Sequence, residues 1–337
     1  MPRVLQILPH PGGGAEAYID LLEGGRYAHE RAAFARSRTW YLAAPAIAVR
    51  VPAIARRARG FDVVHVHGDV AAMLALPALR ARPSVWAPAG LHLLRRASGT
   101  RGRLARAGLR RVIAATGRVL CQSQAEVDDL APLAGGDARK LVVIDNGVRL
   151  PPWPADDERR SAREDLGLTD DAVVALYLGQ LEERKDPLTA VEAARRVDGL
   201  TLLVAGDGPL RAEVERRASA GVRVLGHVDP APLLRAADVF VMPSHREGQS
   251  IAVLEAMAGG LAMVVSDGQG NPEAIGDAGV VVPVGDVDAW ASALARLTAE
   301  PAERQGLQRA ARQRAEERFD VERFRRDIES VYDELLA

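Results

Sequence analysis

The stretch PSHREGQSIAVLEAMAGG, residues 243–260, decides the expected fold. It follows the apolar run Val239–Met242, which predicts a buried strand, and its second half has the Ala, Leu and Met content of a helix. Ser250 stands where a helix N-cap is expected. The stretch therefore predicts a strand, a loop and a helix, and the unpaired amides of that helix start can hold an anion such as a diphosphate.

The same alternation of short apolar runs and helical patterns extends along the chain in both directions. Val4–Leu8, Val63–Val66 and Val119–Cys121 are predicted strands of the first half, and Val173–Leu178 and Ala262–Val265 begin and end a second series. Alternating strands and helices predict parallel sheets with helices on their faces, an α/β class. Ligands of such sheets bind beyond the carboxyl ends of the strands.

Length and composition predict a soluble protein of two domains. The chain has 337 residues, of which 48% are hydrophobic and 26% charged, as in ordinary globular proteins. Pro151–Pro154 reads as a stiff connector and the charged run Asp156–Asp165 as a solvated segment. We therefore expect a first domain of residues 1–152, completed by a C-terminal helix at 320–337, and a second domain of residues 165–319.

Charge is distributed unevenly between the two halves. The first 150 residues hold 22 basic and 11 acidic residues, a net charge of +11, and the remainder is −12. Ten arginines lie between positions 80 and 118 with no acidic residue among them. Such a run is usually a solvated face, but its size also fits an anionic membrane surface or a phosphorylated acceptor. No nucleic-acid-binding motif accompanies it, so we expect no nucleic-acid partner.

Cysteine content and hydropathy predict a cytoplasmic location. Cys121 is the only cysteine, so neither an internal disulfide nor a cysteine-based zinc site is expected. The apolar run near the N-terminus is too short for a signal peptide, and no apolar run reaches the roughly 18 residues of a membrane span. Contact with the inner membrane face is expected to be peripheral, through the Arg-rich region.

The candidate ligand-binding residues are two glutamates and several segments that follow predicted strands. Glu247 precedes the predicted helix and Glu255 lies inside it, so both carboxylates can accept hydrogen bonds from the hydroxyls of one ligand. Residues 179–185, 206–210 and 266–275 also follow predicted strands. Together these segments resemble the donor-binding half of the family 4 retaining glycosyltransferases. The resemblance implies a GT-B fold, with two Rossmann-like domains facing across a cleft.

The resemblance also implies roles for individual residues in the second half. Glu247 is expected to contact the donor sugar and Glu255 the ribose hydroxyls, while Arg184 and Lys185 neutralise the diphosphate, with Lys185 in direct contact. Glu247, Arg184 and Lys185 are the expected catalytic residues. The other expected donor-binding residues are Gly13, Gly14, Gly206, Asp207, Gly248, Gln249 and Ser250.

Acceptor-side residues are expected in the first half. Residues 12–16 resemble the glycine loop of the family, with Glu16 at its end, and residues 62–68 resemble its strand with two histidines. Strand alternation puts both histidines on one sheet face. We interpret His65 as structural and His67, nearer the loop, as an acceptor-side residue.

Two positions depart from the family pattern. Ala89 stands where the family usually has a histidine near the donor sugar, and His92 is a candidate to replace it. Gln180 stands where the family often has an arginine. A donor that needs space at Ala89, a mutated sequence and a loss of transfer activity are the competing explanations. Ala89 and His92 complete the expected acceptor-side set.

The expected function is retaining, metal-independent transfer of a sugar from a UDP- or GDP-sugar to an unidentified small-molecule, glycan or lipid-linked acceptor. No cofactor is expected apart from the nucleotide sugar as co-substrate, and no metal, because no Asp-x-Asp segment lies in a suitable loop. One alternative is an inactive homologue that binds nucleotide sugars as a partner subunit. Another is a nucleotide-sugar epimerase, for which the sequence offers no second acid–base pair.

Overall fold

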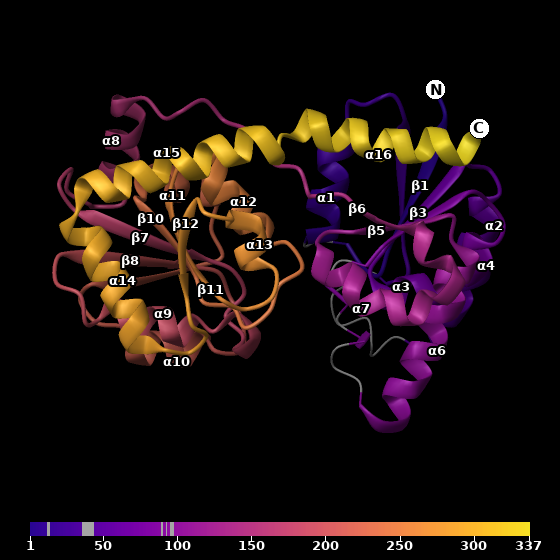
Figure 1. The fold of residues 1–337 in the computed structure, drawn as a ribbon, viewed down its shortest axis with the longest axis horizontal. Coiled ribbons are helices and arrows are strands. Elements are labelled where there is room, and N and C mark those ends of the chain that lie inside the picture. The colour runs from indigo at the N-terminus through magenta and orange to yellow at the C-terminus, as the bar shows by residue number, and fades with distance from the viewer. Residues whose placement is uncertain (12–13, 36–43, 89, 92, 95–97) are drawn as a thin grey trace. The chain divides into compact units, whose positions relative to one another are not determined.

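The computed structural model describes residues 1–11, 14–35, 44–88, 90–91, 93–94 and 98–337 (Figure 1). The chain divides into two compact units, which we call unit 1 (residues 1–147 and 321–337) and unit 2 (residues 148–320). The last helix, α16 (Val321–Leu336), belongs to unit 1. No helix in the described part of the chain combines the length and apolarity needed to cross a membrane.

Unit 1 is built on a parallel sheet of six strands in the order β2-β1-β3-β4-β5-β6. The strands are β1 (Arg3–Leu8), β2 (Ala28–Ala33), β3 (Val63–His67), β4 (Ser84–Ala87), β5 (Arg118–Cys121) and β6 (Leu141–Val143). The helices besides α16 are α1 (Gly14–Leu22), α2 (Ala44–Ala58), α3 (Asp69–Leu74), α4 (Leu76–Leu79), α6 (Gly99–Ala115), α7 (Gln124–Ala134) and the 3-10 helix η2 (Gly135–Lys140).

Unit 2 is built on a second parallel sheet of six strands, in the order β12-β11-β10-β7-β8-β9. The strands are β7 (Val173–Leu178), β8 (Leu200–Ala205), β9 (Val222–Gly226), β10 (Val239–Met242), β11 (Ala262–Ser266) and β12 (Gly279–Val282). The helices are α8 (Asp156–Asp165), η3 (Glu183–Lys185), α9 (Pro187–Ala194), α10 (Arg211–Arg217), α11 (Pro230–Ala236), α12 (Ile251–Ala258), α13 (Asn271–Ile275), α14 (Val287–Ala299) and α15 (Pro301–Arg318). The prediction of two doubly wound parallel sheets is confirmed.

Both sheets are covered by helices on both faces, which is why central strands such as β7, β10 and β11 are almost wholly apolar. In unit 1, Val4 packs in the cluster that includes α1 and α16, whereas its neighbour Leu5 packs in the cluster that includes α2, α4, α6 and α7. Successive residues of a strand point to opposite faces, so the two clusters are the two sides of one sheet. Helix α16 is therefore part of the core of unit 1.

Strand β2, helix α2 and strand β12 are among the elements that were not expected from the sequence. Strand β2 has the sequence AHERAA, which has low strand propensity, and it is held at the sheet edge by parallel pairing with β1. Helix α2 contains Pro52, and strand β12 is a short edge strand. Most residues of the charged run Asp156–Asp165 are exposed, as expected, but the run forms α8, and its buried Arg163 pairs with Asp238 at 2.7 Å.

The strand order of unit 2 fixes where a ligand site is expected. The chain leaves β7 toward β8 and β9 on one side and then returns to β10 on the other side of β7. This reversal is the topological switch point of a Rossmann-type sheet, where the loops from the carboxyl ends of the two central strands diverge and leave a crevice. The segments that follow β7 and β10 contain Arg184, Lys185 and Glu247 and, of the predicted donor-binding residues, Gly248, Gln249 and Ser250.

Candidate functional site

Three loops of unit 2 meet at the carboxyl edge of its sheet. The amide of His245, after β10, donates to the carbonyl of Arg184, after β7, at 3.0 Å. The amide of Glu247 donates to the carbonyl of Gln269, after β11, at 2.8 Å. Backbone bonds between neighbouring loops hold their side chains in fixed relation. We call the residues of these loops, 179–186, 243–250 and 267–271, together with α12, the loop site.

Two glycines make this close approach of loops sterically possible. A Cβ atom at Gly206, where φ is +140°, would overlap the carbonyl of Gly179, so only glycine fits after β8. At Gly270, where φ is +97°, a Cβ atom would come within 2.6 Å of the carbonyl oxygens of Glu247 and Gly248. The predicted donor residue Gly206 thus has a demonstrable packing role.

The loop site contains a compact cluster of opposite charges. Lys185 Nζ lies 2.6 Å from Glu247 Oε1, and Arg184 Nη1 lies 3.2 Å from Glu247 Oε2. Arg184 also pairs with Glu182 at 2.8 Å. Only 8% of the Glu247 side chain and 12% of the Lys185 side chain are exposed. Of the three residues predicted to be catalytic, Arg184 and Lys185 therefore both contact Glu247 directly.

The electrostatics of Glu247 follow from these neighbours. Burial by itself raises the pKa of a carboxyl, but the charges of Lys185 and Arg184 outweigh it, so the pKa of Glu247 lies below its ordinary value. The carboxylate is ionised at neutral pH and holds both cations in place.

Glu255 is in a different environment. It lies on α12, and burial raises the pKa of its carboxyl. No hydrogen bond or ion pair to this carboxyl occurs within the described residues. A partly buried carboxylate without a protein partner can accept hydrogen bonds from ligand hydroxyls.

The start of α12 carries unpaired backbone donors. Ser250 occupies the N-cap position, as expected, but its hydroxyl makes no capping hydrogen bond. The amides of Gly248 and Ser250 donate to no partner in the described part of the chain. Unpaired amides at a helix N-terminus favour an anion. Gln249, between them, is buried.

Two aspartates, Asp186 in the loop site and Asp207 in the neighbouring loop after β8, make hydrogen bonds and ion pairs with nearby residues. Asp207 accepts a hydrogen bond from the amide of Gly208 at 2.7 Å and pairs with Arg211 at 3.2 Å, and its side chain is half exposed. Asp186 was not predicted as a site residue. It accepts a hydrogen bond from the hydroxyl of Thr189 at 2.7 Å and lies 3.4 Å from His245. Its position directly before Pro187 is an N-cap signal that the sequence contained.

Three of the residues predicted in the first half lie outside the described residues: Gly13, predicted to bind the donor, and Ala89 and His92, predicted on the acceptor side. Gly14 is the first residue of α1. Glu16 lies 3.3 Å from Arg31 of β2. These placements leave the predicted roles of Gly14 and Glu16 untested.

His67 belongs to a buried polar cluster of unit 1. Its Nε2 lies 2.6 Å from Gln6 Oε1, its ring stacks on that of His65 at 4.3 Å, and His65 Nδ1 lies 2.7 Å from the hydroxyl of Tyr332 on α16. Burial lowers the pKa of His67 to about 3, so its ring is neutral. These contacts give both histidines structural partners, and an acceptor role for His67 remains a prediction.

Two buried carboxylates of unit 1 hold the segment after β4. Glu126 accepts a hydrogen bond from the amide of Gly90 at 2.6 Å, and Asp69 accepts one from the amide of Leu93. Between them Leu91 has a φ of +50°, a conformation that is uncommon for a residue other than glycine. Such strain is often found beside binding sites. The sequence analysis did not single out either carboxylate, because their partners are backbone amides.

Comparison with known proteins identifies the family of both halves. The model described as Glycosyltransferase Family 4 matches residues 6–150, and the one described as Glycosyl transferases group 1 matches residues 172–300. The D-inositol 3-phosphate glycosyltransferase of Saccharomonospora viridis is 33% identical over 254 residues, which cover 68% of this chain and 58% of that protein. That of Mycobacterium tuberculosis strain H37Ra is 33% identical over 226 residues, covering 62% and 47%. The chain thus spans about half the length of these relatives.

Solved structures share the fold over nearly the whole chain. Anabaena HepE, in complex with UDP and glucose, has a TM-score of 0.84 at 20% identity and covers 99% of this chain and 100% of its own. Sucrose-phosphate synthase from Thermosynechococcus elongatus has a TM-score of 0.82 at 21% identity, covering 99% of each chain. The two six-stranded parallel sheets and this likeness confirm the GT-B class. Since matches to both halves accompany this fold, the chain belongs to glycosyltransferase family 4.

Proposed function

We propose that this protein transfers a sugar from a nucleoside diphosphate sugar to a hydroxyl acceptor, with retention of configuration and without a metal. The observation that carries the proposal is the contact between Glu247, Lys185 and Arg184 at the switch point of the unit 2 sheet. Two cations and a row of unpaired amides match the charge of a diphosphate, and two carboxylates match the hydroxyls on either side of it.

In this proposal, six residues of the loop site contact the donor. Lys185 and Arg184 bind the diphosphate, and Gly248 and Ser250 donate amide hydrogen bonds to its distal phosphate. Glu255 accepts from the ribose hydroxyls, and Glu247 accepts from the donor sugar while it orients Lys185. Because the cations are already paired with Glu247, their side chains lose little freedom when the donor binds.

The reaction breaks the bond between the anomeric carbon and the phosphate oxygen. The acceptor oxygen forms its bond to the same carbon on the same face of the sugar, and the acceptor proton passes to the departing phosphate oxygen. Lys185 and Arg184 stabilise the negative charge that develops on the leaving diphosphate. No protein side chain is required as the general base, which is consistent with alanine at position 89.

The donor and acceptor are proposed from the relatives. Anabaena HepE has been crystallised with UDP, with UDP and glucose, and with UDP-glucose, which favours a UDP-sugar over a GDP-sugar. The first relatives are named for D-inositol 3-phosphate, so a phosphorylated polyol is the first acceptor to test. We also propose peripheral contact with the anionic cytoplasmic face of a membrane, which the Arg-rich region of unit 1 supports.

Calorimetric titration with UDP, GDP and UDP-glucose tests donor binding, and incubation with UDP-glucose and inositol 3-phosphate tests transfer. We expect binding of UDP, turnover that persists in excess EDTA, and a product whose anomeric configuration by NMR equals that of the donor. Inversion, or activity abolished by EDTA, would contradict the proposed mechanism. Nucleotide binding without turnover on any acceptor would instead support the inactive partner subunit.

A further inference from the structure

The guanidinium group of Arg184 is held from two sides. Its Nε and Nη2 both donate to Glu182 Oε1, at 3.1 and 2.8 Å. Its Nη1 donates to Glu247 Oε2 at 3.2 Å and to the carbonyl of Arg246 at 3.1 Å. A guanidinium has five N–H donors in one rigid plane. These four hydrogen bonds leave one N–H, on Nη2, for a further acceptor.

The backbone of Arg184 is fixed as well. Its carbonyl accepts a hydrogen bond from the amide of His245 at 3.0 Å, which joins the loop after β7 to the loop after β10. Only 24% of the Arg184 side chain and 26% of the Glu182 side chain are exposed. The direction of the remaining Nη2 donor is therefore set by protein contacts, and Glu182 supplies two of them.

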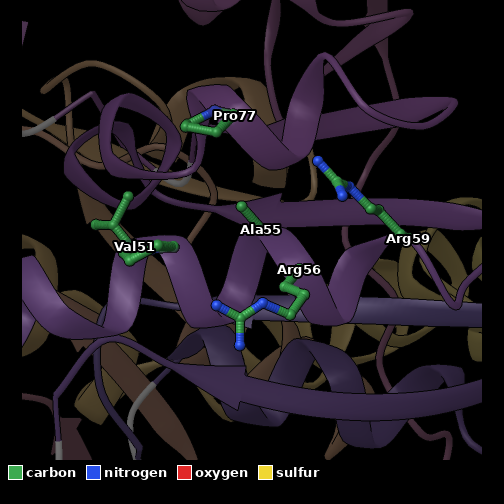
Figure 2. A pocket seen from close by; sticks show the side chains of 6 residues that line it. Val51, Ala55, Arg56, Arg59 and Pro77 are labelled. Carbon is green, nitrogen blue, oxygen red and sulfur yellow. The ribbon is translucent and has the colours of Figure 1, made fainter.

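The arginines beside a hollow of unit 1 are not held in this way. Figure 2 shows this hollow of about 300 Å³, lined by Val51, Pro52, Ala55, Arg56, Arg59 and Pro77. Arg56 and Arg59 are exposed, and no ion pair involves either side chain in the described part of the chain. The lining of the hollow includes no carboxylate that could orient them. Arg184 thus differs from these arginines in having a set orientation.

The charge of Glu182 is unfavourable for binding an anion. The segment Glu182–Asp186 contains three carboxylates and only two cations. A carboxylate near a diphosphate repels it. Affinity for the diphosphate therefore does not account for a carboxylate at position 182, whereas orientation of Arg184 does.

We propose that Glu182 is a positioning residue for the sugar transfer. It orients Arg184 so that the remaining N–H on Nη2 donates to the phosphate oxygen on which charge develops as the anomeric bond breaks. A donor fixed in advance stabilises that charge without reorganisation at the transition state. This inference rests on the proposed function and adds to it a residue that contacts neither donor nor acceptor.

The variant Glu182→Gln separates orientation from binding. Release of UDP from UDP-glucose in the presence of inositol 3-phosphate is expected to show a kcat about 10- to 100-fold lower, because Arg184 is no longer held on its Nε side. The Kd for UDP by calorimetry is expected to stay equal or to fall by up to about 3-fold, because a negative charge near the diphosphate is removed. An unchanged kcat, or a raised Kd that accounts for the whole loss, would overturn the proposal.

Glu192→Gln is the matched control. The Glu192 side chain is also 26% exposed and pairs with an arginine, Arg195, at 3.2 Å, but it lies on α9 outside the loop site. Urea denaturation is expected to show a similar, small loss of stability in both variants, whereas kcat of Glu192→Gln is expected to stay within about 2-fold of the wild type. Equal losses of kcat in the two variants would show that only stability is affected and would overturn the proposal.

A double variant tests whether Glu182 acts through Arg184. In an Arg184→Gln background, Glu182→Gln is expected to lower kcat by less than about 2-fold further, because the group that it orients is gone. A further loss as large as in the wild-type background would overturn the proposal. A wild type that binds no UDP would overturn the proposed function and this inference with it. An active wild type whose kcat is unaffected by Glu182→Gln would overturn this inference alone.

Discussion

Replacing Lys185 with alanine perturbs the loop site at its centre. In the wild type Lys185 Nζ lies 2.6 Å from the Glu247 carboxylate, whose side chain is only 8% exposed. Removing one partner of a buried ion pair typically costs about 3–5 kcal/mol. Here Arg184 remains 3.2 Å from the same carboxylate. We therefore expect a smaller loss in the free energy of unfolding of unit 2, about 1–3 kcal/mol.

The loss of stability is expected to depend on pH. The pKa of Glu247 is lowered in the folded protein, so its ionised form contributes stability above the unfolded pKa of about 4.3, and this contribution disappears as the pH falls through the folded value. The difference between wild type and Lys185→Ala is thus largest near neutral pH and shrinks below about pH 4. Urea denaturation at pH 7 and at about pH 2.5 measures the difference in unfolding free energy between wild type and variant on either side of this transition.

Nucleotide binding is the decisive readout for Lys185→Ala. A hydrogen bond to a charged group contributes about 1.5–3 kcal/mol, so the Kd for UDP is expected to rise about 10- to 150-fold by calorimetry. Lys140→Ala is the matched control, because Lys140 is the only other lysine, its side chain is 18% exposed, and its Nζ donates to backbone carbonyls in unit 1. An unchanged Kd in Lys185→Ala, at a protein stability that has fallen, would refute the assignment of Lys185 to the diphosphate.

Three further predictions concern other residues. Glu255→Gln is expected to weaken UDP binding about 10-fold; because burial raises the pKa of Glu255, removing this charge is also expected to raise the free energy of unfolding at pH 7, a gain that vanishes below the wild-type pKa. A lower free energy of unfolding at pH 7, together with an unchanged Kd for UDP, would contradict both expectations for Glu255→Gln. Gly206→Ala is expected to destabilise unit 2 by about 2–5 kcal/mol in urea denaturation, because its Cβ would overlap the carbonyl of Gly179, whereas Gly24→Ala, at a φ of +90° with open space around it, is expected to cost about 1 kcal/mol. Equal losses of stability in Gly206→Ala and Gly24→Ala would show that the protein relieves the overlap with the carbonyl of Gly179. The pKa of His67 is lowered to about 3, so the unfolded state binds its proton first and stability falls as the pH drops below about 6.5; in urea denaturation at pH 7 and pH 5, His67→Asn is expected to reduce this fall by about 2 kcal/mol, and an unchanged fall would contradict a neutral His67.

The sequence was sufficient to predict those helices and strands that are encoded by a short, continuous run of residues. Apolar runs such as Val173–Leu178 and Ala262–Val265 predicted strands that the structure contains, because buried parallel strands are apolar throughout. Strand β2 and helix α8 were missed because tertiary contacts stabilise them. The helix that contains Arg163 depends on Asp238, which is 75 positions away in the sequence. No window of local sequence contains that contact.

The spacing of motifs predicted which residues form the candidate site, but not all of the contacts that they make. Glu247, Lys185 and Arg184 were chosen from separate segments, and the strand order of unit 2 brings them into contact. The spacing could not indicate that Ser250 leaves its capping bond unmade, since that depends on the rotamer of one side chain. It could not identify Glu126 either, because a buried carboxylate that binds amides leaves no periodic signal.

The central claim is that a nucleoside diphosphate binds where β7 and β10 diverge, between the amides that open α12 and the basic pair after β7. A crystal structure of the protein with UDP tests it most directly. The account predicts the distal phosphate within about 3.2 Å of the amides of Gly248 and Ser250 and of Lys185 Nζ, with the ribose hydroxyls bonded to Glu255. A nucleotide that touches neither Lys185 nor Glu255 would contradict the account.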